Sequence, residues 1–174
     1  MELLYISVDY GTLNPTSMGL WYLTDDGNAY RIRESYYDAR KEGLSRTDEE
    51  HYRELVKLAG NLKDRIEYVI VDPSAASFIE CIRRHDEFSV RKANNDVLDG
   101  IRNTGTLLKA QRLHFSPECR DTIREFGLYC WDEKAKEDKV IKENDHAMDD
   151  IRYFVHTVMR REFPDFLVIK EAEQ

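Results

Sequence analysis

The sequence predicts an α/β fold in which a mixed β-sheet, made of an antiparallel three-strand meander and additional parallel strands, is flanked by helices. The meander follows from three strand-like runs, at residues 3–9, 17–23 and 29–37, of which the last two are joined by the turn Asp25-Asp26-Gly27-Asn28. The parallel strands follow from the strand–helix–strand order in the middle of the chain, because such a crossover connects parallel strands of one sheet.

A helix is expected to begin at Thr47, because Glu50 three residues later completes the pattern of a capping box. Apolar residues continue from there at helical spacing, at Leu55, Leu58, Ala59, Leu62 and Ile66. A buried strand is then predicted at 68–71, a helix at 75–84 and a short strand at 88–92.

The second half of the chain contains three further helical patterns. The first covers 95–109, with its apolar positions at Val97, Ile101 and Leu108. The second is expected to open with Ser116 as N-cap and Pro117 at the first helical position, and to run through Phe126. The third covers about 146–161, with an apolar stripe at Ala147, Ile151, Phe154, Val155 and Val158. The charged stretch 131–143 between the last two is either a β-hairpin or a loop.

Composition and charge favour one soluble domain, predicted over residues 1–164, with 165–174 as a C-terminal tail. Of the 174 residues 41% are hydrophobic and 34% are charged, and no apolar run approaches the roughly 20 residues of a membrane span. We find no secretory signal pattern at the N-terminus. The net charge of −8 argues against a general nucleic-acid binder, although a local basic surface can coexist with it.

The cysteines indicate a reducing compartment. Cys81, Cys119 and Cys130 are odd in number and have no CxxC spacing. We therefore interpret them as reduced thiols of a cytoplasmic protein, and as neither a disulfide framework nor a zinc site.

Three aspartates stand in positions that suit metal binding. Asp9 and Asp72 each end an apolar, strand-like run, and Asp149 lies in the first turn of the last helix. A buried carboxylate is costly unless a positive charge lies against it, and a divalent cation can hold several together. The alternatives are that Asp9 is a turn residue before Gly11, that Asp72 caps the next helix, and that Asp149 interacts with a helix N-terminus.

Two further groups of residues accompany these aspartates. His146 precedes Asp149 by three residues on the same helical face, so it is a candidate metal ligand, carboxylate partner or proton shuttle, or else a surface histidine. The roles of Asp145 and Asp150 stay open. Four lysines of the 131–143 stretch could contact a DNA backbone or simply be solvated, namely Lys134, Lys136, Lys139 and Lys142.

The motifs around the aspartates resemble one family. They are Val8-Asp9-Tyr10-Gly11-Thr12, Val71-Asp72-Pro73-Ser74-Ala75 and the stretch from Asn144 to Tyr153, to which the segment 92–101 adds a similar helix entry. Together with the element order, they resemble the C-terminal nuclease domain of the large terminase subunit of tailed double-stranded DNA phages, which has a ribonuclease H-like fold. The third motif is the most specific.

This resemblance implies a metal-dependent endonuclease that cleaves double-stranded DNA concatemers at the start and end of genome packaging. Asp9, Asp72 and Asp149 match the family's metal-binding carboxylates, and His146 matches a histidine of some members. Two Mg²⁺ or Mn²⁺ ions are implied, with Asp9 expected to bridge them. The implied partners are double-stranded DNA, the terminase ATPase domain, the small terminase subunit and the portal protein, in the host cytoplasm and without a membrane. The chain contains no GxxxxGK[ST] loop, so we expect it to be the nuclease half alone.

Three other functions compete with this interpretation. A Holliday-junction-resolvase-like nuclease would use a similar set of acids on the same fold. A non-catalytic docking module of the packaging motor would use the acidic surface without metal. The turn after Asp9 also resembles the first phosphate loop of the actin and sugar-kinase superfamily, but no second glycine-rich loop follows Asp72.

Overall fold

One six-stranded sheet forms the centre of the molecule, as a computed structural model describes it for residues 2–129, 133–137 and 139–167. The strand order is β5-β4-β1-β2-β3-β6. The strands are β1 (Leu3–Asp9), β2 (Thr16–Leu23), β3 (Ala29–Tyr37), β4 (Ile66–Val71), β5 (Val90–Lys92) and β6 (Leu113–Phe115). β1, β2 and β3 pair antiparallel, whereas β4 pairs parallel with β1 and β5, and β6 pairs parallel with β3. The predicted mixed sheet is confirmed.

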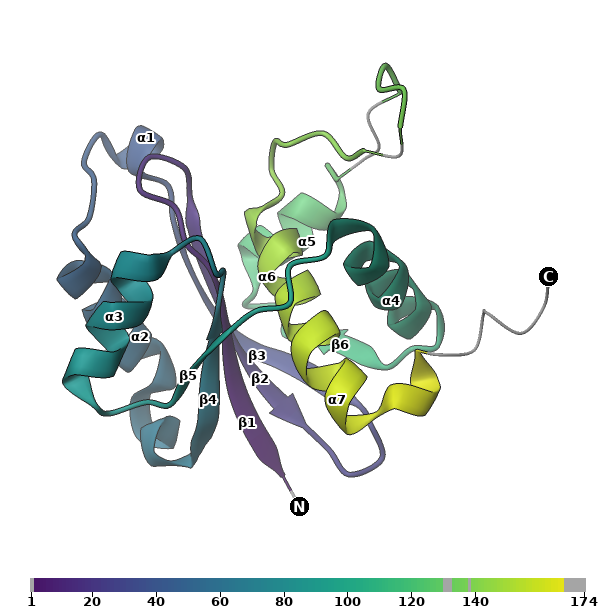
Figure 1. The fold of residues 1–174 in the computed structure, drawn as a ribbon, viewed down its shortest axis with the longest axis horizontal. Helices are drawn as coiled ribbons and strands as arrows, with labels where there is room; N and C mark the ends of the chain where they lie inside the picture. The colour runs from purple at the N-terminus through teal and green to yellow at the C-terminus, as the bar shows by residue number, and fades with distance from the viewer. Residues whose placement is uncertain (1, 130–132, 138, 168–174) are drawn as a thin grey trace.

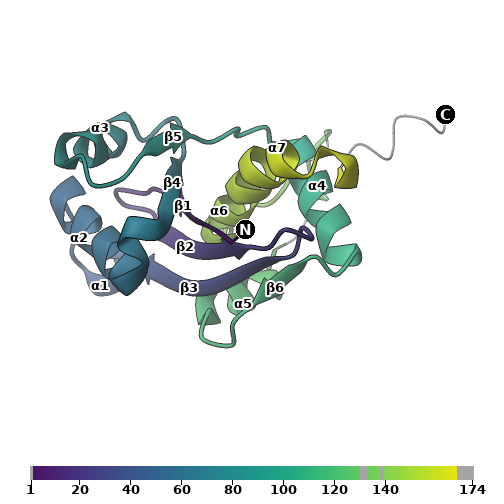
Figure 2. The same cartoon turned by 90° about the horizontal axis from the view of Figure 1, so that it is seen from below.

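Helices cover both faces of the sheet (Figures 1 and 2). On one side lie α2 (Asp48–Ala59) and α3 (Ala76–His85). On the other lie α4 (Val97–Lys109), α5 (Arg120–Phe126) and α6 (His146–Phe154), which continues through a π-helical segment (Val155–Met159) into α7 (Arg160–Glu162). Short helical turns complete the described chain, at α1 (Ala39–Glu42), η1 (Gly60–Arg65) and η3 (Pro164–Phe166).

The two layers of helices enclose separate halves of the core. Ile6 and Val8 of β1 pack with Leu55 of α2, while Tyr5 of the same strand packs with Phe154 of α6 on the opposite face. Successive side chains of a strand point to opposite faces, so a strand covered on both faces must be apolar at nearly every position. This explains the run that ends at Asp9, in which Ser7 is the one small polar residue among apolar and aromatic ones.

The capping box that opens α2 is formed as predicted. The Glu50 amide donates to Thr47 Oγ1 at 3.2 Å, and the Thr47 amide donates to a Glu50 carboxylate oxygen at 2.8 Å. The helix nevertheless ends at Ala59, so the predicted apolar stripe is too long. Gly60 follows with a φ of 52°, and Ile66, which we assigned to the stripe, begins β4.

The prediction of a helix opening at Ser116 and Pro117 is wrong. α5 begins at Arg120, and the Ser116 hydroxyl instead accepts a hydrogen bond from the Glu118 amide at 3.3 Å within a turn. The preceding residues form β6, which pairs with β3 and was not predicted. Three residues are too few to show a strand period in a sequence, so only their pairing partner reveals them.

The predicted apolar face of α4 is also displaced. Val97 is exposed and Ile101 and Leu108 are half-buried, whereas Gly100 and Leu107 are buried. A Cβ atom at position 100 would collide with the side chain of Arg152 on α6. The glycine that weakened the helical pattern is therefore what lets α4 approach α6.

Several predictions fall partly outside the described residues. Within 131–143, the described part contains no hairpin, only an isolated bridge at Val140, and residue 131 is not described. Cys81 and Cys119 are buried free thiols, as expected, while Cys130 lies outside the described residues. At the C-terminal end Phe166 stacks on Phe163 at 5.3 Å, so the first residues beyond 164 contact the domain. In the described part of the chain, no helix is long and apolar enough to span a membrane.

Candidate active site

Two of the predicted site residues meet at the same edge of the sheet. Asp9 is the last residue of β1, and Asp72 directly follows β4. These two strands are parallel neighbours in which Val8 pairs with Val71, and the Asp72 amide donates to the Val8 carbonyl at 3.3 Å. The carboxyl ends of parallel strands lie at one edge of a sheet, where ligands commonly bind. Their adjacency therefore follows from the strand pairing.

Helix α6 carries the other two residues, and a buried ion pair fixes its position on the sheet. Asp150, fully buried, binds the guanidinium of Arg31 on β3, with Nη2 to Oδ2 at 2.9 Å. It also accepts hydrogen bonds from Ser7 of β1, at 2.8 Å, and from Ser17 of β2. Asp150 thus anchors α6 to three strands. Its neighbour Asp149 is turned toward the strand ends.

The N-terminus of α6 is held by a residue that the sequence did not reveal. The buried Glu125 of α5 accepts hydrogen bonds from the Ala147 and Met148 amides at 2.6 and 3.1 Å, and from the Tyr36 hydroxyl at 2.7 Å. Burial raises the pKa of Glu125, although these bonds oppose the shift. An acidic residue that caps a helix normally lies at the start of that same helix, where the sequence pattern reveals it. Glu125 lies more than 20 residues before the amides that it caps, so no local pattern indicates this role.

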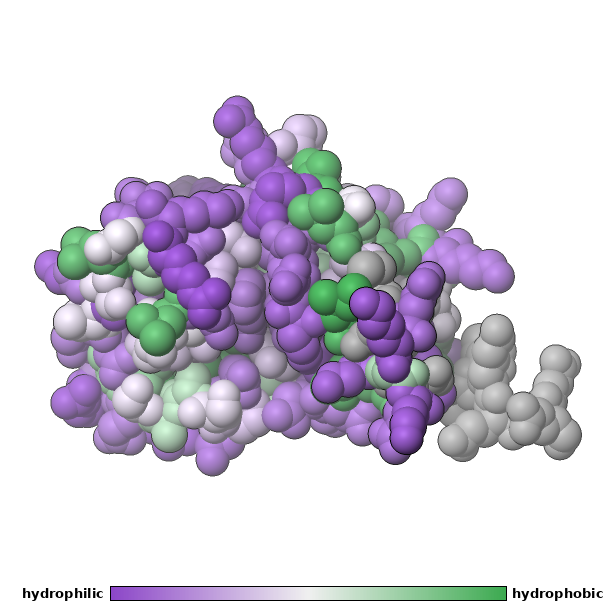
Figure 3. Space-filling view, turned by 90° about the horizontal axis from the view of Figure 1, so that it is seen from above, coloured by the Kyte–Doolittle hydropathy of each residue, from purple (hydrophilic) through white to green (hydrophobic). Residues whose placement is uncertain are grey.

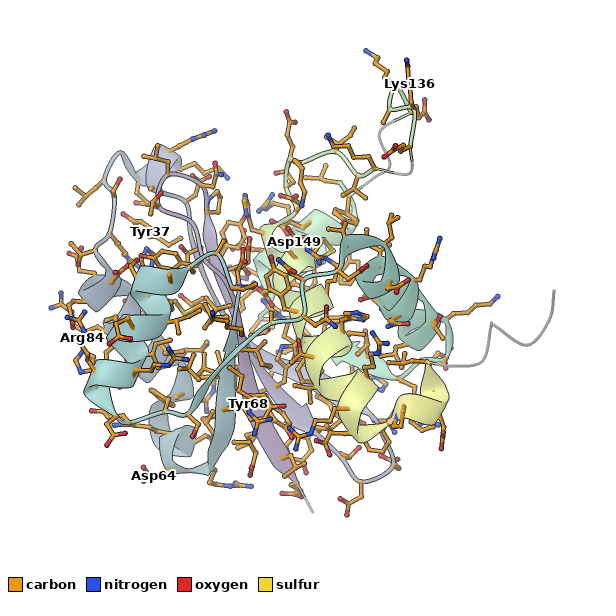
Figure 4. The ribbon with its side chains drawn as sticks, viewed as in Figure 1. Tyr37, Asp64, Tyr68, Arg84, Lys136 and Asp149 are labelled. Carbon is orange, nitrogen blue, oxygen red and sulfur yellow. The ribbon has the colours of Figure 1, made fainter. Side chains whose placement is uncertain are left out.

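All four predicted site residues line one cleft of about 350 Å³. Asp9, Asp72, His146 and Asp149 border it, and so do Asp145, Lys142, Arg152 and Tyr153. Figure 4 shows Asp149 on α6 among the side chains gathered where the helix passes the strand ends. The side of the molecule on which β1 ends, seen in Figure 3, is predominantly hydrophilic, with apolar residues in small separate groups.

Asp9 and His146 are in direct contact within the cleft. His146 Nδ1 lies 2.9 Å from Asp9 Oδ2. Burial raises the pKa of Asp9 to about 7, and the Asp149 carboxylate adds to this shift while His146 opposes it. Burial alone would lower the pKa of His146, but its hydrogen bond to Asp9 and the nearby carboxylate charges together outweigh that effect and raise the pKa. The cleft therefore contains more negative charge than its own residues neutralise.

Asp72 does not cap α3 as the alternative interpretation proposed. The helix begins at Ala76 without a side-chain cap, and Asp72 Oδ1 instead accepts from the Ser74 amide at 2.9 Å, closing the turn before it. The other oxygen, Oδ2, accepts from the Tyr153 hydroxyl of α6 at 3.3 Å. One oxygen thus orients the carboxylate while the other faces the cleft.

Asp149 is held between two cationic side chains that we did not assign to the site. Arg152 Nη2 donates to Oδ1 at 3.0 Å, and Lys142 Nζ donates to Oδ2 at 3.0 Å while lying 3.2 Å from Asp145. Arg152 is three residues from Asp149 on α6, a spacing that could have revealed it. Lys142 was considered only as a DNA contact, because a loop lysine has no spacing that links it to a helix.

The donor set fits hard divalent cations. Every anionic donor of the cleft is a carboxylate, which suits Mg²⁺ or Mn²⁺, and the Lys142 ammonium already lies among them. No three ligand atoms of this cleft lie within 4.8 Å of one another in the described residues, so one ion could not contact Asp9, Asp72 and Asp149 as they stand.

Comparison with known proteins identifies relatives through structure. Neither a protein-family model nor a curated protein sequence matches the chain. Among solved structures, the large terminase of a thermophilic bacteriophage, solved in complex with ADP, is 48% identical over 90% of this chain, with a TM-score of 0.86. Over most of its own length, this chain is similar to a phage large terminase. It spans 40% of the length of that ADP-bound large terminase.

The fold matches the nuclease domains of large terminases. The P22 large terminase nuclease domain is 20% identical, with a TM-score of 0.71 over 95% of this chain and 86% of its own length. The large terminase nuclease of the thermophilic phage G20c, solved with bound magnesium, is 11% identical, with a TM-score of 0.61 over 87% of this chain and 79% of its own. The predicted resemblance and fold class are confirmed.

Proposed function

We propose that this chain is a metal-dependent endonuclease domain that cleaves double-stranded DNA concatemers at the initiation and termination of phage genome packaging. The observation that carries the proposal is the convergence of Asp9, Asp72 and Asp149, with His146, on one cleft at the strand ends. The relationship to large terminases supports the biological setting. The proposed domain extends over residues 1–164, with 165–174 as its tail.

Within this proposal, Asp9 would contact two Mg²⁺ or Mn²⁺ ions, Asp72 one of them and Asp149 the other. When bound, such ions neutralise the charge that develops on the phosphate and activate the attacking water. Asp9 suits the bridging role because it ends a strand that is paired on both sides and because its neighbour His146 holds one of its oxygens.

The chain's own side chains would prepare the cleft for this chemistry. His146 Nδ1, 2.9 Å from Asp9, fixes the orientation of that carboxylate and can hold a proton there. The Tyr153 hydroxyl orients Asp72 from the opposite side. Arg152 holds Asp149 through Oδ1, which leaves the bond from Lys142 to Oδ2 as the one that a metal ion would replace.

The partners proposed for the whole protein are double-stranded DNA, the terminase ATPase domain, the small terminase subunit and the portal protein, within the host cytoplasm. A net charge of −8 opposes tight binding to DNA by this domain alone. Tethering to a motor that already holds the DNA raises the effective concentration and would offset that weakness. Cleavage would then be restrained until the motor presents the DNA.

The test is cleavage of supercoiled and linear plasmid in Mg²⁺, Mn²⁺ or EDTA. We expect metal-dependent cutting by the wild type, and its loss in both Asp9→Ala and Asp149→Ala. Asp64→Ala is the matched control, because this exposed aspartate lies in η1, far from Asp149 in Figure 4, and should cut normally.

Two outcomes would contradict the proposal. Full activity in Asp9→Ala would remove the central ligand from the mechanism. A folded wild type that neither cuts nor gains thermal stability with Mg²⁺ or Mn²⁺ would favour a docking module, since a ligand that binds the native state must stabilise it. A marked preference for four-way junctions over plasmid would favour the resolvase-like alternative.

A further inference from the structure

A second cluster of ligating side chains lies away from the cleft, between α2 and α3. Glu49, Cys81 and His85 each place a ligand atom within 4.8 Å of the others, and in the described residues no other group of histidine, cysteine and carboxylate side chains converges in this way. Both helices lie on the face of the sheet opposite α6 (Figure 1). The cluster is therefore separated from the aspartate cleft by the sheet.

The geometry of the cluster follows from two positions on α3 and one in the first turn of α2. Cys81 and His85 are four residues apart on α3 and share one face, and Glu49 lies in the first turn of α2. His85 Nε2 is 2.7 Å from Glu49 Oε2, and Cys81 Sγ is 3.5 Å from Glu49 Oε1. Cys81 is buried while the other two residues are exposed, so the cluster is closed on the side of Cys81 and open to solvent on the side of Glu49 and His85.

Neighbouring side chains hold the cluster in place. The His85 ring stacks on the Tyr52 ring of α2, with centroids 3.8 Å apart and planes inclined by 5°. This stacking fixes the imidazole with Nε2 toward Glu49. An ion pair between His85 and Glu49 would account for those two residues, but not for the Cys81 thiol that approaches the same carboxylate from the buried side.

We propose that Glu49, Cys81 and His85 form a binding site for a borderline-soft divalent cation, Zn²⁺ above all, with water as the fourth ligand. One thiolate, one imidazole and one carboxylate are ligands that Zn²⁺ takes at about 2.0–2.3 Å, which places tetrahedral ligand atoms about 3.3–3.8 Å apart. The 3.5 Å between Cys81 Sγ and Glu49 Oε1 already matches that spacing, and the 2.7 Å contact between His85 and Glu49 would have to open slightly to reach it. The Cys and His ligands distinguish this site from the all-carboxylate cleft, which suits harder ions.

Occupation of the site would cross-link α2 to α3. Tyr10, which borders the cleft, donates its hydroxyl to Asp48 beside Glu49 and stacks on Phe78 of α3 at 4.7 Å. The expected effect of Zn²⁺ is therefore a more stable helix pair. Burial, reinforced by Glu49, raises the pKa of the Cys81 thiol to about 11, so without metal the thiol stays protonated.

The direct test is titration of the reduced chain with Co²⁺ as a spectroscopic probe for Zn²⁺. A thiolate bound to Co²⁺ produces a strong near-ultraviolet charge-transfer band, which carboxylates and imidazoles do not. We expect this band at one equivalent in the wild type, with bleaching by added Zn²⁺. The band should vanish in Cys81→Ser. In His85→Gln, a change at an exposed residue, the band should need on the order of tenfold or more Co²⁺ to appear. Cys119→Ser and Cys130→Ser are the matched controls and should keep it.

A second measurement, of thermal stability, separates Zn²⁺ binding at this cluster from misfolding of a variant and from metal binding in the aspartate cleft. The Zn²⁺-induced rise in Tm, measured in an Asp9→Asn background, should persist there, shrink when His85→Gln is added and disappear when Cys81→Ser is added. The inference is overturned if the reduced wild type shows no thiolate–cobalt band, or if the band survives in Cys81→Ser. Neither outcome bears on the proposed nuclease function, which depends on other residues.

Discussion

At the scale of single residues, the cleft is organised by charges that lack full compensation. Asp9 is nearly buried, hydrogen-bonded to His146 and close to the Asp149 carboxylate. Such an arrangement costs folding free energy unless a proton or a cation neutralises it. The same cost makes binding of a cation favourable, because the cation relieves a repulsion that already exists.

The raised pKa of Asp9 predicts a pH dependence of metal binding. The folded pKa, about 7, lies above the unfolded value of 3.8, so the contribution of Asp9 to stability is fully present below pH 3.8 and is lost as pH rises through about 7. A divalent cation binds the ionised form, so the Mg²⁺-induced rise in Tm should grow between about pH 6 and about pH 8. Thermal unfolding with and without Mg²⁺ measures this.

The Asp9→Asn variant is the control for that measurement. It removes the buried charge while keeping the side chain's size, so without metal at about pH 8 its Tm should exceed the wild type's, by about 2–4 °C for each kcal/mol of relieved repulsion. Its response to Mg²⁺ should be small and nearly independent of pH. A wild-type response that is equally large at both pH values would show that Asp9 does not titrate with metal binding.

At the scale of elements, the distance between α4 and α6 sets the position of Arg152, one of the two cationic side chains that hold Asp149. Arg152 passes over Gly100, and its guanidinium donates to the Asn95 and Asp96 carbonyls as well as to Asp149. Glycine in a helix interior costs about 0.5–1 kcal/mol relative to alanine. Here that cost is offset by the close approach of the two helices.

Gly100→Ala should therefore destabilise the protein by about 1–3 kcal/mol and disturb the Arg152–Asp149 contact, because the added methyl group overpacks the interface. Gly105→Ala in the same helix is the matched control. Nothing lies within 4 Å of a Cβ there, so it should stabilise by about 0.5–1 kcal/mol. Urea unfolding of both variants measures the difference, and equal effects at the two positions would contradict the packing argument.

At the scale of the whole molecule, one buried ion pair joins the sheet to the layer of helices that carries the site. Arg31 and Asp150 are both fully buried and are contributed by β3 and α6. Gly19 on β2 leaves room for the guanidinium, since a Cβ at that position would collide with it. The pair adds orientation rather than much net stability, because burying two charges costs nearly as much as their attraction returns.

Removing one partner should be far more harmful than removing both. Arg31→Met should cost about 3–5 kcal/mol, because it leaves Asp150 buried and unpaired. The double variant Arg31→Met with Asp150→Leu should be destabilised by less than the sum of the single variants, which urea unfolding in a double-mutant cycle measures. Simple additivity would show that the two side chains do not stabilise each other in the fold.

Loss of the ion pair is also expected to displace α6, and this displacement can be measured through activity. Plasmid cleavage by the double variant should fall even where the protein is folded, because Asp149 is the residue next to the anchor. Asp64→Ala again provides the unaffected comparison. Unchanged cleavage by a folded double variant would show that α6 is positioned by its apolar contacts alone.

Much of the fold could be predicted because its signals are local. The apolar runs of β1 and β4, the Thr47 capping box and the stripe of the last helix each depend on neighbours within a few residues along the chain. Two of the failures occurred where a partner distant in sequence decided the outcome. β6 exists through its pairing with β3, and the buried face of α4 is decided by Arg152.

The sequence by itself determined the mixed sheet, the placement of Asp9 and Asp72 at strand ends, and the position of His146 and Asp149 on one helical face. Periodicity and turn chemistry carry that information along the chain. Only the tertiary structure decided what neutralises these charges. His146 and Asp9 are 137 residues apart, and Tyr153 and Asp72 are 81 apart. Coulombic and ligand contacts depend on distance in space, which no local pattern encodes.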